Sequence, residues 1–344
     1  MSFGTLALIG ICGLAGPLLS AAGQGLVPAV VGEIVAGVIV GRTGLQLLDT
    51  ANTTLSFLSD VGFAMLMFSV GMNVPLREKG VLASLDRGAL AAGVGGILAV
   101  GAGVLVSWIG GVGHPAVYAV LVASGSAAVV LPIIRERRLT GPAVLTLVAQ
   151  VTVADVATTI AIPFVLRPGK ALNGAVGTGV IAVSLIGIFA FGRSLRGAQV
   201  VRALRRQGKR RRWVIDLRAA LIVLFGLAWI AQRTGASVLI AGFGAGLLVA
   251  AVGGPKHLST EVLGVAGGFF VPLFFVVLGA RIDLRGVVQD PAMVGLAFAL
   301  AALTTTVHVL AAVISRQPLA PDCSPAPSSA SHPRSCRWGW PSMS

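Results

Sequence analysis

Charged residues are scarce in this chain: Asp, Glu, Lys and Arg make up 11% of its 344 residues, whereas 56% are apolar. Soluble domains carry about 25% charged residues, so this composition favours a protein embedded in lipid. Cysteine is scarce too, and Cys12, Cys323 and Cys336 indicate neither a disulfide framework nor a metal site. The sequence contains no Asp-rich metal motif and no pair of catalytic carboxylates, which argues against a membrane-embedded transferase.

The chain contains many long apolar runs. A membrane-spanning helix needs about 20 predominantly apolar residues. Such windows cover residues 5–22, 26–42, 54–74, 89–111, 115–136, 143–166, 174–193, 217–235, 237–253, 267–284 and 292–315. Unbroken runs of this length exclude a β-barrel. The sequence therefore predicts an all-α polytopic membrane protein with about eleven spans.

Basic residues are distributed unevenly between the loops. The loops and span edges on one side hold 18 Lys and Arg residues, and those on the other side hold 6. Because Lys and Arg accumulate in short cytoplasmic loops, we expect the N-terminus outside and the basic loops in the cytoplasm. The basic stretch 193–212 then anchors the chain at the membrane surface, an interpretation that we favour over a nucleic-acid site. The first span lacks a basic leading region, so we do not expect a cleaved signal peptide.

A weak internal repeat links the two halves of the chain. Gly37 in the second window corresponds to Gly246 in the ninth at an offset of 209, and Gly71 corresponds to Gly279 at an offset of 208. Units seven spans apart enter the membrane from opposite sides, as in the inverted repeats of many secondary transporters. We expect a first repeat at about residues 26–193 and a second, incomplete one at about 217–316, within a transport domain that covers residues 1–316.

Asp155 lies near the centre of window 143–166. A carboxylate at the middle of a spanning helix costs roughly 2.5–3.5 kcal/mol even on the lenient insertion scale, and such groups usually mark an ion or proton pathway. A buried Asp held by the backbone of an interrupted helix is the alternative. Glu33, the other acid well inside a window, lies nearer a span end, where we favour a structural or interfacial role.

Four stretches of the chain resemble one known family. They are residues 30–37 (VVGEIVAG), residues 126–132 (SAAVVLP), Asp155 itself, and residues 269–275 (FFVPLFF) with Gly279 and Asp283 after them. The sequence resembles the bacterial monovalent cation:proton antiporters, which include Kef-type potassium efflux proteins and Na⁺/H⁺ antiporters of the same fold. The resemblance runs from about residue 5 to about residue 318.

This resemblance implies a fold and a function. The fold has two interrupted helices that cross at mid-membrane beside the helix with the ion-binding aspartate, and Asp155 matches that aspartate. The function is exchange of Na⁺ or K⁺ for H⁺ across the bacterial cytoplasmic membrane by alternating access. A carboxylate in a partly dry cavity holds a proton or a cation in turn. The resemblance also implies a homodimer, no cofactor and no enzymatic activity.

Seven further positions bear on the site. Ser124 and Ser126 lie where the first interrupted helix is expected. Thr152, Thr158 and Thr159 offer hydroxyl ligands, although Thr in a span more often bonds its own helix. His308 stands where some relatives carry a basic residue that contacts the aspartate or the crossing backbone, although a lone His in a span is more often a hydrogen-bonded core residue. Relatives often have a polar residue just before the aspartate, and here it is Ala154, which favours a site of single charge and electroneutral exchange.

The tail, residues 317–344, departs from this pattern. It is rich in Pro and Ser and holds no spanning window. An alternative frame of permitted GC-rich codons from Ala320 spells an apolar helix-like string. We therefore expect a frameshift near codon 320, a missing C-terminal span and little activity in the present chain. A Kef-type efflux path, an organic-anion symporter, a membrane sensor and an inactive truncated fragment remain the alternative functions.

Overall fold

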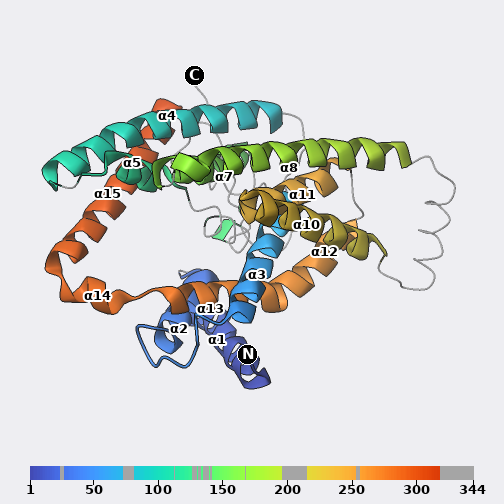
Figure 1. The fold of residues 1–344 in the computed structure, drawn as a ribbon, viewed down its shortest axis with the longest axis horizontal. Helices are drawn as coiled ribbons and strands as arrows, with labels where there is room; N and C mark the ends of the chain where they lie inside the picture. Colours follow the sequence, from blue (N-terminus) through green and yellow to red (C-terminus); the bar gives the residue numbers. More distant parts are fainter. Residues whose placement is uncertain are drawn as a thin grey trace, which may run out of the picture. The chain divides into compact units, whose positions relative to one another are not determined.

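The computed structural model describes residues 1–23, 27–72, 81–111, 113–125, 130, 133–134, 139, 142–166, 168–195, 215–252 and 256–317. Every regular element within these ranges is helical (Figure 1). The described residues form two compact units. The first unit contains those of 1–75 and 172–285, and the second contains those of 76–171 and 286–344.

Seven helical segments in the described ranges are long and apolar enough to cross a membrane. They lie in α1 (Phe3–Ala22), α3 (Thr53–Met72), α4 (Val81–Ile109), α8 (Pro168–Leu195), α10 (Ile215–Thr234), α15 (Pro291–Ile314) and the continuous run α12 (Lys256–Val265), η1 (Ala266–Phe270) and α13 (Val271–Arg281). Three further apolar helical segments are shorter: α2 (Ala29–Val40), residues Ala143–Thr158 within α7 (Pro142–Leu166), and α11 (Val238–Val252). The all-helical membrane fold is confirmed, and the count of about eleven spans is confirmed in part.

The helical run Lys256–Arg281, which covers most of window 267–284, is continuous but not uniformly α-helical. A single π-helical turn, η1, separates α12 from α13. Pro272 has no N–H to donate to the carbonyl four residues earlier, so the ordinary α-helical ladder is interrupted at this point. The helix accommodates the proline by widening one turn.

In the first unit, the helices of the predicted repeats pair crosswise. Helix α2 packs on α13, and α3 packs on α11 (Figure 1). Four glycines permit this approach, because a Cβ on each would collide with a backbone carbonyl oxygen of the facing helix: Gly37 with Val276, Gly279 with Ile34, Gly71 with Phe243, and Gly246 with Phe68. Phe243 and Gly246 stand 209 positions after Ile34 and Gly37, and Val276 and Gly279 stand 208 positions after Phe68 and Gly71. The contact between α2 and α13 is therefore equivalent, under the repeat, to the contact between α3 and α11.

The directions of these helices are those of an inverted repeat. The start of α3 meets the end of α13, since Arg281 Nη2 donates to Ser56 Oγ at 2.8 Å. Farther along α3, Gly62 lies against the carbonyl of Phe270. Contact positions thus rise along α3 as they fall along α13 and η1, so the two equivalent helices run in opposite directions. The limits of the two repeats stay a prediction.

The second unit is built around α4. Helices α5 (Pro115–Ala123), α7 and α15 all pack on α4, and α5 also contacts α7 and α15. Small residues bring the helices close: a Cβ on Gly88 would stand 2.7 Å from the carbonyl oxygen of Thr146 on α7. The apolar core of this unit contains Ala99, Ala102, Val122 and Val307. The short helix α14 (Leu284–Gln289) precedes α15.

Candidate ion-binding site

Buried polar side chains gather on α7. Of the eight buried polar or charged residues in the described part of the chain, five belong to this one helix: Thr146, Gln150, Thr152, Asp155 and Thr158. Asp155 is only 9% exposed. Thr152 and Thr158 stand three residues before and after it, so all three side chains share one face of the helix. A buried polar face in an otherwise apolar span is costly, which favours a functional role.

Helix α5 is too short to cross a membrane. It has nine residues and is about 14 Å long at 1.5 Å per residue, against about 30 Å of hydrocarbon. It ends at Ala123, and Ser124 has an extended backbone with φ −65° and ψ 120°. The helix of window 115–136 is therefore interrupted at Ser124, where the sequence predicts an opened backbone. Ser126 lies outside the described residues.

The end of α5 reaches α7 next to Asp155. A Cβ on Gly125 would lie 3.4 Å from Val151 Cγ1 and 3.5 Å from Val151 Cα. Val151 is one helical turn before Asp155. The last carbonyl groups of a helix lack partners within it and carry the negative end of the helix dipole. The geometry thus places a carboxylate and a helix C-terminus in one region, which suits a cation.

The threonines beside Asp155 differ in their hydrogen bonds. Thr158 Oγ1 donates to the carbonyl of Ala154 at 2.8 Å and lies 3.2 Å from that of Asp155, so it serves its own helix. Thr152 Oγ1 is buried and has no hydrogen-bond partner among the described residues. Leaving a buried hydroxyl unpaired costs about 1–3 kcal/mol, which a bound ion or water would offset. The side chain of Thr159 lies outside the described ones.

His308 is held by its own helix. Its Nδ1 lies 2.9 Å from the carbonyl oxygen of Thr304, and α15 packs on α4 and α5. Within the described residues, no hydrogen bond or ion pair joins His308 to Asp155. The structure therefore brings Ser124 and Thr152 near Asp155 without linking His308 to it. The functional roles of all four residues stay predictions.

Two further buried polar side chains are an acid, Glu33, and an amide, Gln150. Glu33 is buried on α2 in the first unit, where a Cβ on Gly16 of α1 would come within 2.8 Å of Glu33 Cγ. Gln150, on α7, is 4% exposed, and its Oε1 has no partner among the described residues. Our sequence interpretation missed Gln150. Its amide side chain, which lies inside an apolar window, is the sequence feature that could have identified it as a site residue.

Known proteins are similar to this chain in sequence and in architecture. The family described as "Sodium/hydrogen exchanger, transmembrane" matches residues 5–327. The chain belongs to this family. The prediction from the sequence motifs is thereby confirmed at the level of the family.

Individual relatives are distant. The Na⁺/H⁺-K⁺ antiporter GerN of Bacillus cereus is 25% identical over 296 residues, which are 80% of this chain and 70% of GerN. The glutathione-regulated potassium-efflux system protein KefC of Salmonella typhimurium is 30% identical over 276 residues, which are 76% of this chain and 43% of KefC. YjbQ of Bacillus subtilis is 26% identical over 77% of this chain and 45% of its own length. The chain thus spans less than half of the length of KefC and YjbQ.

A solved structure agrees with the fold. The sodium proton antiporter MjNhaP1 from Methanocaldococcus jannaschii superposes with a TM-score of 0.62, over 91% of this chain and 78% of that one. The identity is 15%, so this likeness shows the fold alone.

Proposed function

We propose that this protein exchanges a monovalent cation, Na⁺ or K⁺, for H⁺ across the cytoplasmic membrane, with Asp155 binding the cation and the proton in turn. One observation carries the proposal: a buried carboxylate lies one helical turn from the point where the interrupted α5 meets α7. The similarity to GerN, a Na⁺/H⁺-K⁺ antiporter, and to KefC, a potassium-efflux protein, supports this substrate class.

The proposed transport cycle follows from the free-energy cost of moving an unneutralised carboxylate through the membrane. Asp155 is neutral overall when it holds either a proton or a monovalent cation, and the empty carboxylate is expensive to move through hydrocarbon. Movement between inward and outward access therefore carries one species each way. The preceding residue is the buried, apolar Ala154, so the site holds one negative charge and the exchange is one cation for one proton. The orientation with basic loops inside and a homodimeric assembly belong to this proposal.

Dissipation of a pH gradient in proteoliposomes tests the function. Na⁺ or K⁺ is added to vesicles that hold the chain, its frame-restored version or the Asp155→Asn variant of the active form. With the frame-restored chain we expect cation-dependent collapse of the gradient and no membrane potential generated by the exchange. We expect little response with the present chain and none with Asp155→Asn. Exchange that survives Asp155→Asn would falsify the site, and a restored chain inert to every monovalent cation would overturn the function.

A further inference from the structure

Gln150 is a buried polar residue of α7 that the proposed transport cycle does not use. Its side chain is 4% exposed, and its Oε1 has no hydrogen-bond partner in the part of the chain that the structure describes. Removing an amide oxygen from water without giving it a partner opposes folding. Such a group inside a membrane helix indicates a ligand that supplies the missing interaction.

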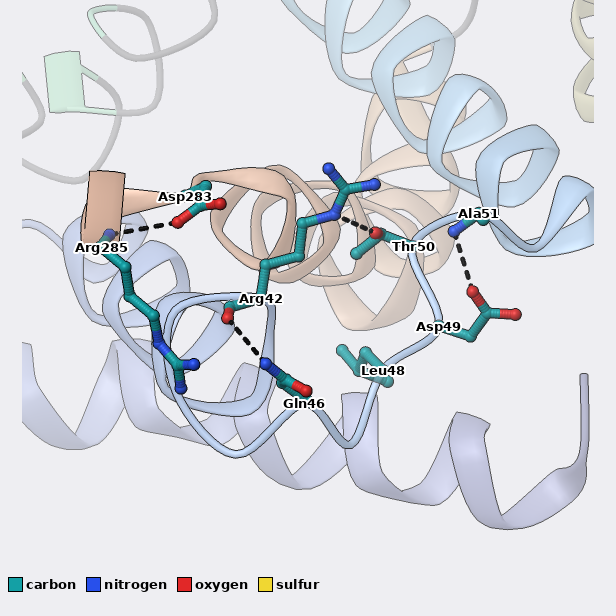
Figure 2. A pocket seen from close by; sticks show the side chains of 8 residues that line it. All are labelled: Arg42, Gln46, Leu48, Asp49, Thr50, Ala51, Asp283 and Arg285. Carbon is teal, nitrogen blue, oxygen red and sulfur yellow. Dashed lines mark hydrogen bonds between the residues drawn. The ribbon is translucent and has the colours of Figure 1, made fainter. Parts of the chain in front are cut away.

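The charged pocket of the first unit offers a contrast. It lies between the α2–α3 loop and the residues that follow α13 (Figure 2). Arg42 Nε donates to Thr50 Oγ1 at 2.9 Å, and Asp283 Oδ1 accepts from the backbone N–H of Arg285 at 3.1 Å. The carboxylate of Asp49 lies across the pocket from that of Asp283 (Figure 2). These charged groups therefore hold the loop and do not converge on one ligand.

Gln150 lies where α4, α5 and α7 meet. A Cβ on Gly88 of α4 would stand 2.8 Å from the backbone nitrogen of Gln150. A Cβ on Gly125, just past the end of α5, would stand 3.5 Å from Val151 Cα. Helices α4 and α5 also pack on each other. Successive residues of a helix point about 100° apart, so Gln150 projects next to the sector of α7 that the end of α5 covers.

Asp155 lies on the other side of that contact. Five residues of an α-helix give a net rotation of about 140° and a rise of about 7.5 Å, so Gln150 and Asp155 are two successive positions for an ion and do not share one. The end of α5 meets Val151, which lies between them on the helix surface. The last carbonyl groups of α5 lack partners within their own helix. An amide oxygen, helix-end carbonyls and a carboxylate thus follow one another along this junction.

We propose that Gln150 is a cation ligand on the route to Asp155, a proposal that rests on the proposed exchange function. Its amide oxygen and the carbonyl groups at the end of α5 hold the cation after it sheds water and before it reaches the carboxylate. Carbonyl oxygens replace the hydration shell of monovalent cations in membrane proteins. A side-chain amide does not titrate near neutral pH, so Gln150 acts on the cation and leaves the proton affinity of Asp155 unchanged.

Cation binding to the purified full chain tests this proposal through Gln150→Met and Gln150→Glu. Met has nearly the volume of Gln without its carbonyl oxygen, and Glu keeps an oxygen at the same reach. Titration calorimetry with Na⁺ and with K⁺ should show about tenfold weaker binding in Gln150→Met, the effect of one lost ligand to a charged group. Gln150→Glu should bind at least as tightly as the parent chain. Parental affinity in Gln150→Met would overturn the proposal.

Thermal unfolding in detergent separates a ligand from a residue that only holds the helices together. In choline chloride, without Na⁺ or K⁺, Gln150→Met should unfold at a higher temperature than the parent chain, because the unpartnered amide is gone. A lower unfolding temperature would assign Gln150 a structural role and overturn the proposal. Gln232→Met, at an exposed position of α10, is the matched control and should behave as the parent chain does in both assays.

Asp155→Asn distinguishes failure of this proposal from failure of the exchange function. If the parent chain binds cation and Asp155→Asn does not, unchanged binding in Gln150→Met removes Gln150 from the route and leaves the function standing. If the parent chain binds no monovalent cation, or Asp155→Asn binds as the parent does, both proposals are wrong.

Discussion

The two units differ in what they bury: close glycine contacts between helix backbones in the first, and polar side chains in the second. In the first unit, α2, α3, α11 and α13 meet backbone to backbone through glycines. In the second unit, five buried polar side chains lie on α7, and the neighbouring helix α5 stops after nine residues. Close glycine packing fixes helices rigidly, whereas a buried carboxylate beside an opened helix is costly to stability. We infer that the first unit serves as a rigid scaffold and that the second holds the proposed ion site.

Asp155→Asn should have the largest effect on function. The amide cannot take up a proton or neutralise a cation, so we expect cation-dependent proton movement to fall to the leak rate of protein-free liposomes. Size-exclusion elution should be unchanged, since Asn has nearly the same volume as Asp. Transport that persists in this variant would show that Asp155 is not the ion-binding residue.

Gly37→Ala and Gly246→Ala test the scaffold. A Cβ at either position collides with a facing carbonyl, and such overpacking costs about 1–3 kcal/mol. Thermal unfolding in detergent should show similar losses for both variants, because their contacts are equivalent by the repeat. Gly226→Ala on α10 is the control, since a Cβ there meets nothing within 4 Å. Clearly unequal losses at Gly37 and Gly246 would argue against the two-fold arrangement.

Thr152→Val compared with Thr158→Val probes the polar face of α7. Thr152 Oγ1 has no partner among the described residues, and Thr158 Oγ1 bonds its own helix. Loss of one ligand worth about 1 kcal/mol should weaken cation affinity about fivefold in Thr152→Val. Thr158→Val should change affinity little. Cation-concentration curves of exchange give both values, and the reverse order would remove Thr152 from the site.

His308→Gln should have the smallest effect. The ring bonds Thr304 on α15 and is not joined to Asp155, and Gln also offers a donor near that carbonyl. We expect the rate and the pH profile of exchange to change by less than about twofold, as for the loss of one neutral hydrogen bond. A large shift of the pH profile would show that His308 acts on Asp155 and would enlarge the site to include α15.

Much of this organisation could be predicted from residue patterns. Apolar windows located the helices because lipid leaves few alternatives for the backbone. Gly37, Gly71, Gly246 and Gly279 marked the repeat because close packing requires them. Asp155 could be identified because a carboxylate in the middle of a spanning helix carries a large free-energy cost. The π-turn before Pro272 and the end of α5 at Ala123 were less predictable, because they depend on how neighbouring helices satisfy the opened backbone.

Side-chain partners were the least predictable part. Thr152 and Thr158 have the same spacing from Asp155, yet one has no partner among the described residues and the other bonds its own helix. Rotamer choice, set by packing, separates them. Gln150 was missed because its burial depends on the close approach of α4, where a Cβ on Gly88 would stand 2.8 Å from the backbone nitrogen of Gln150.

The count of protons released per bound cation tests the central claim most directly. Calorimetric titration of Na⁺ or K⁺ in two buffers of different ionisation enthalpy measures this number across pH. A single carboxylate shared by cation and proton predicts a maximum of one proton per cation, and none in Asp155→Asn. Release of two protons per cation, or release that persists in Asp155→Asn, would contradict the account.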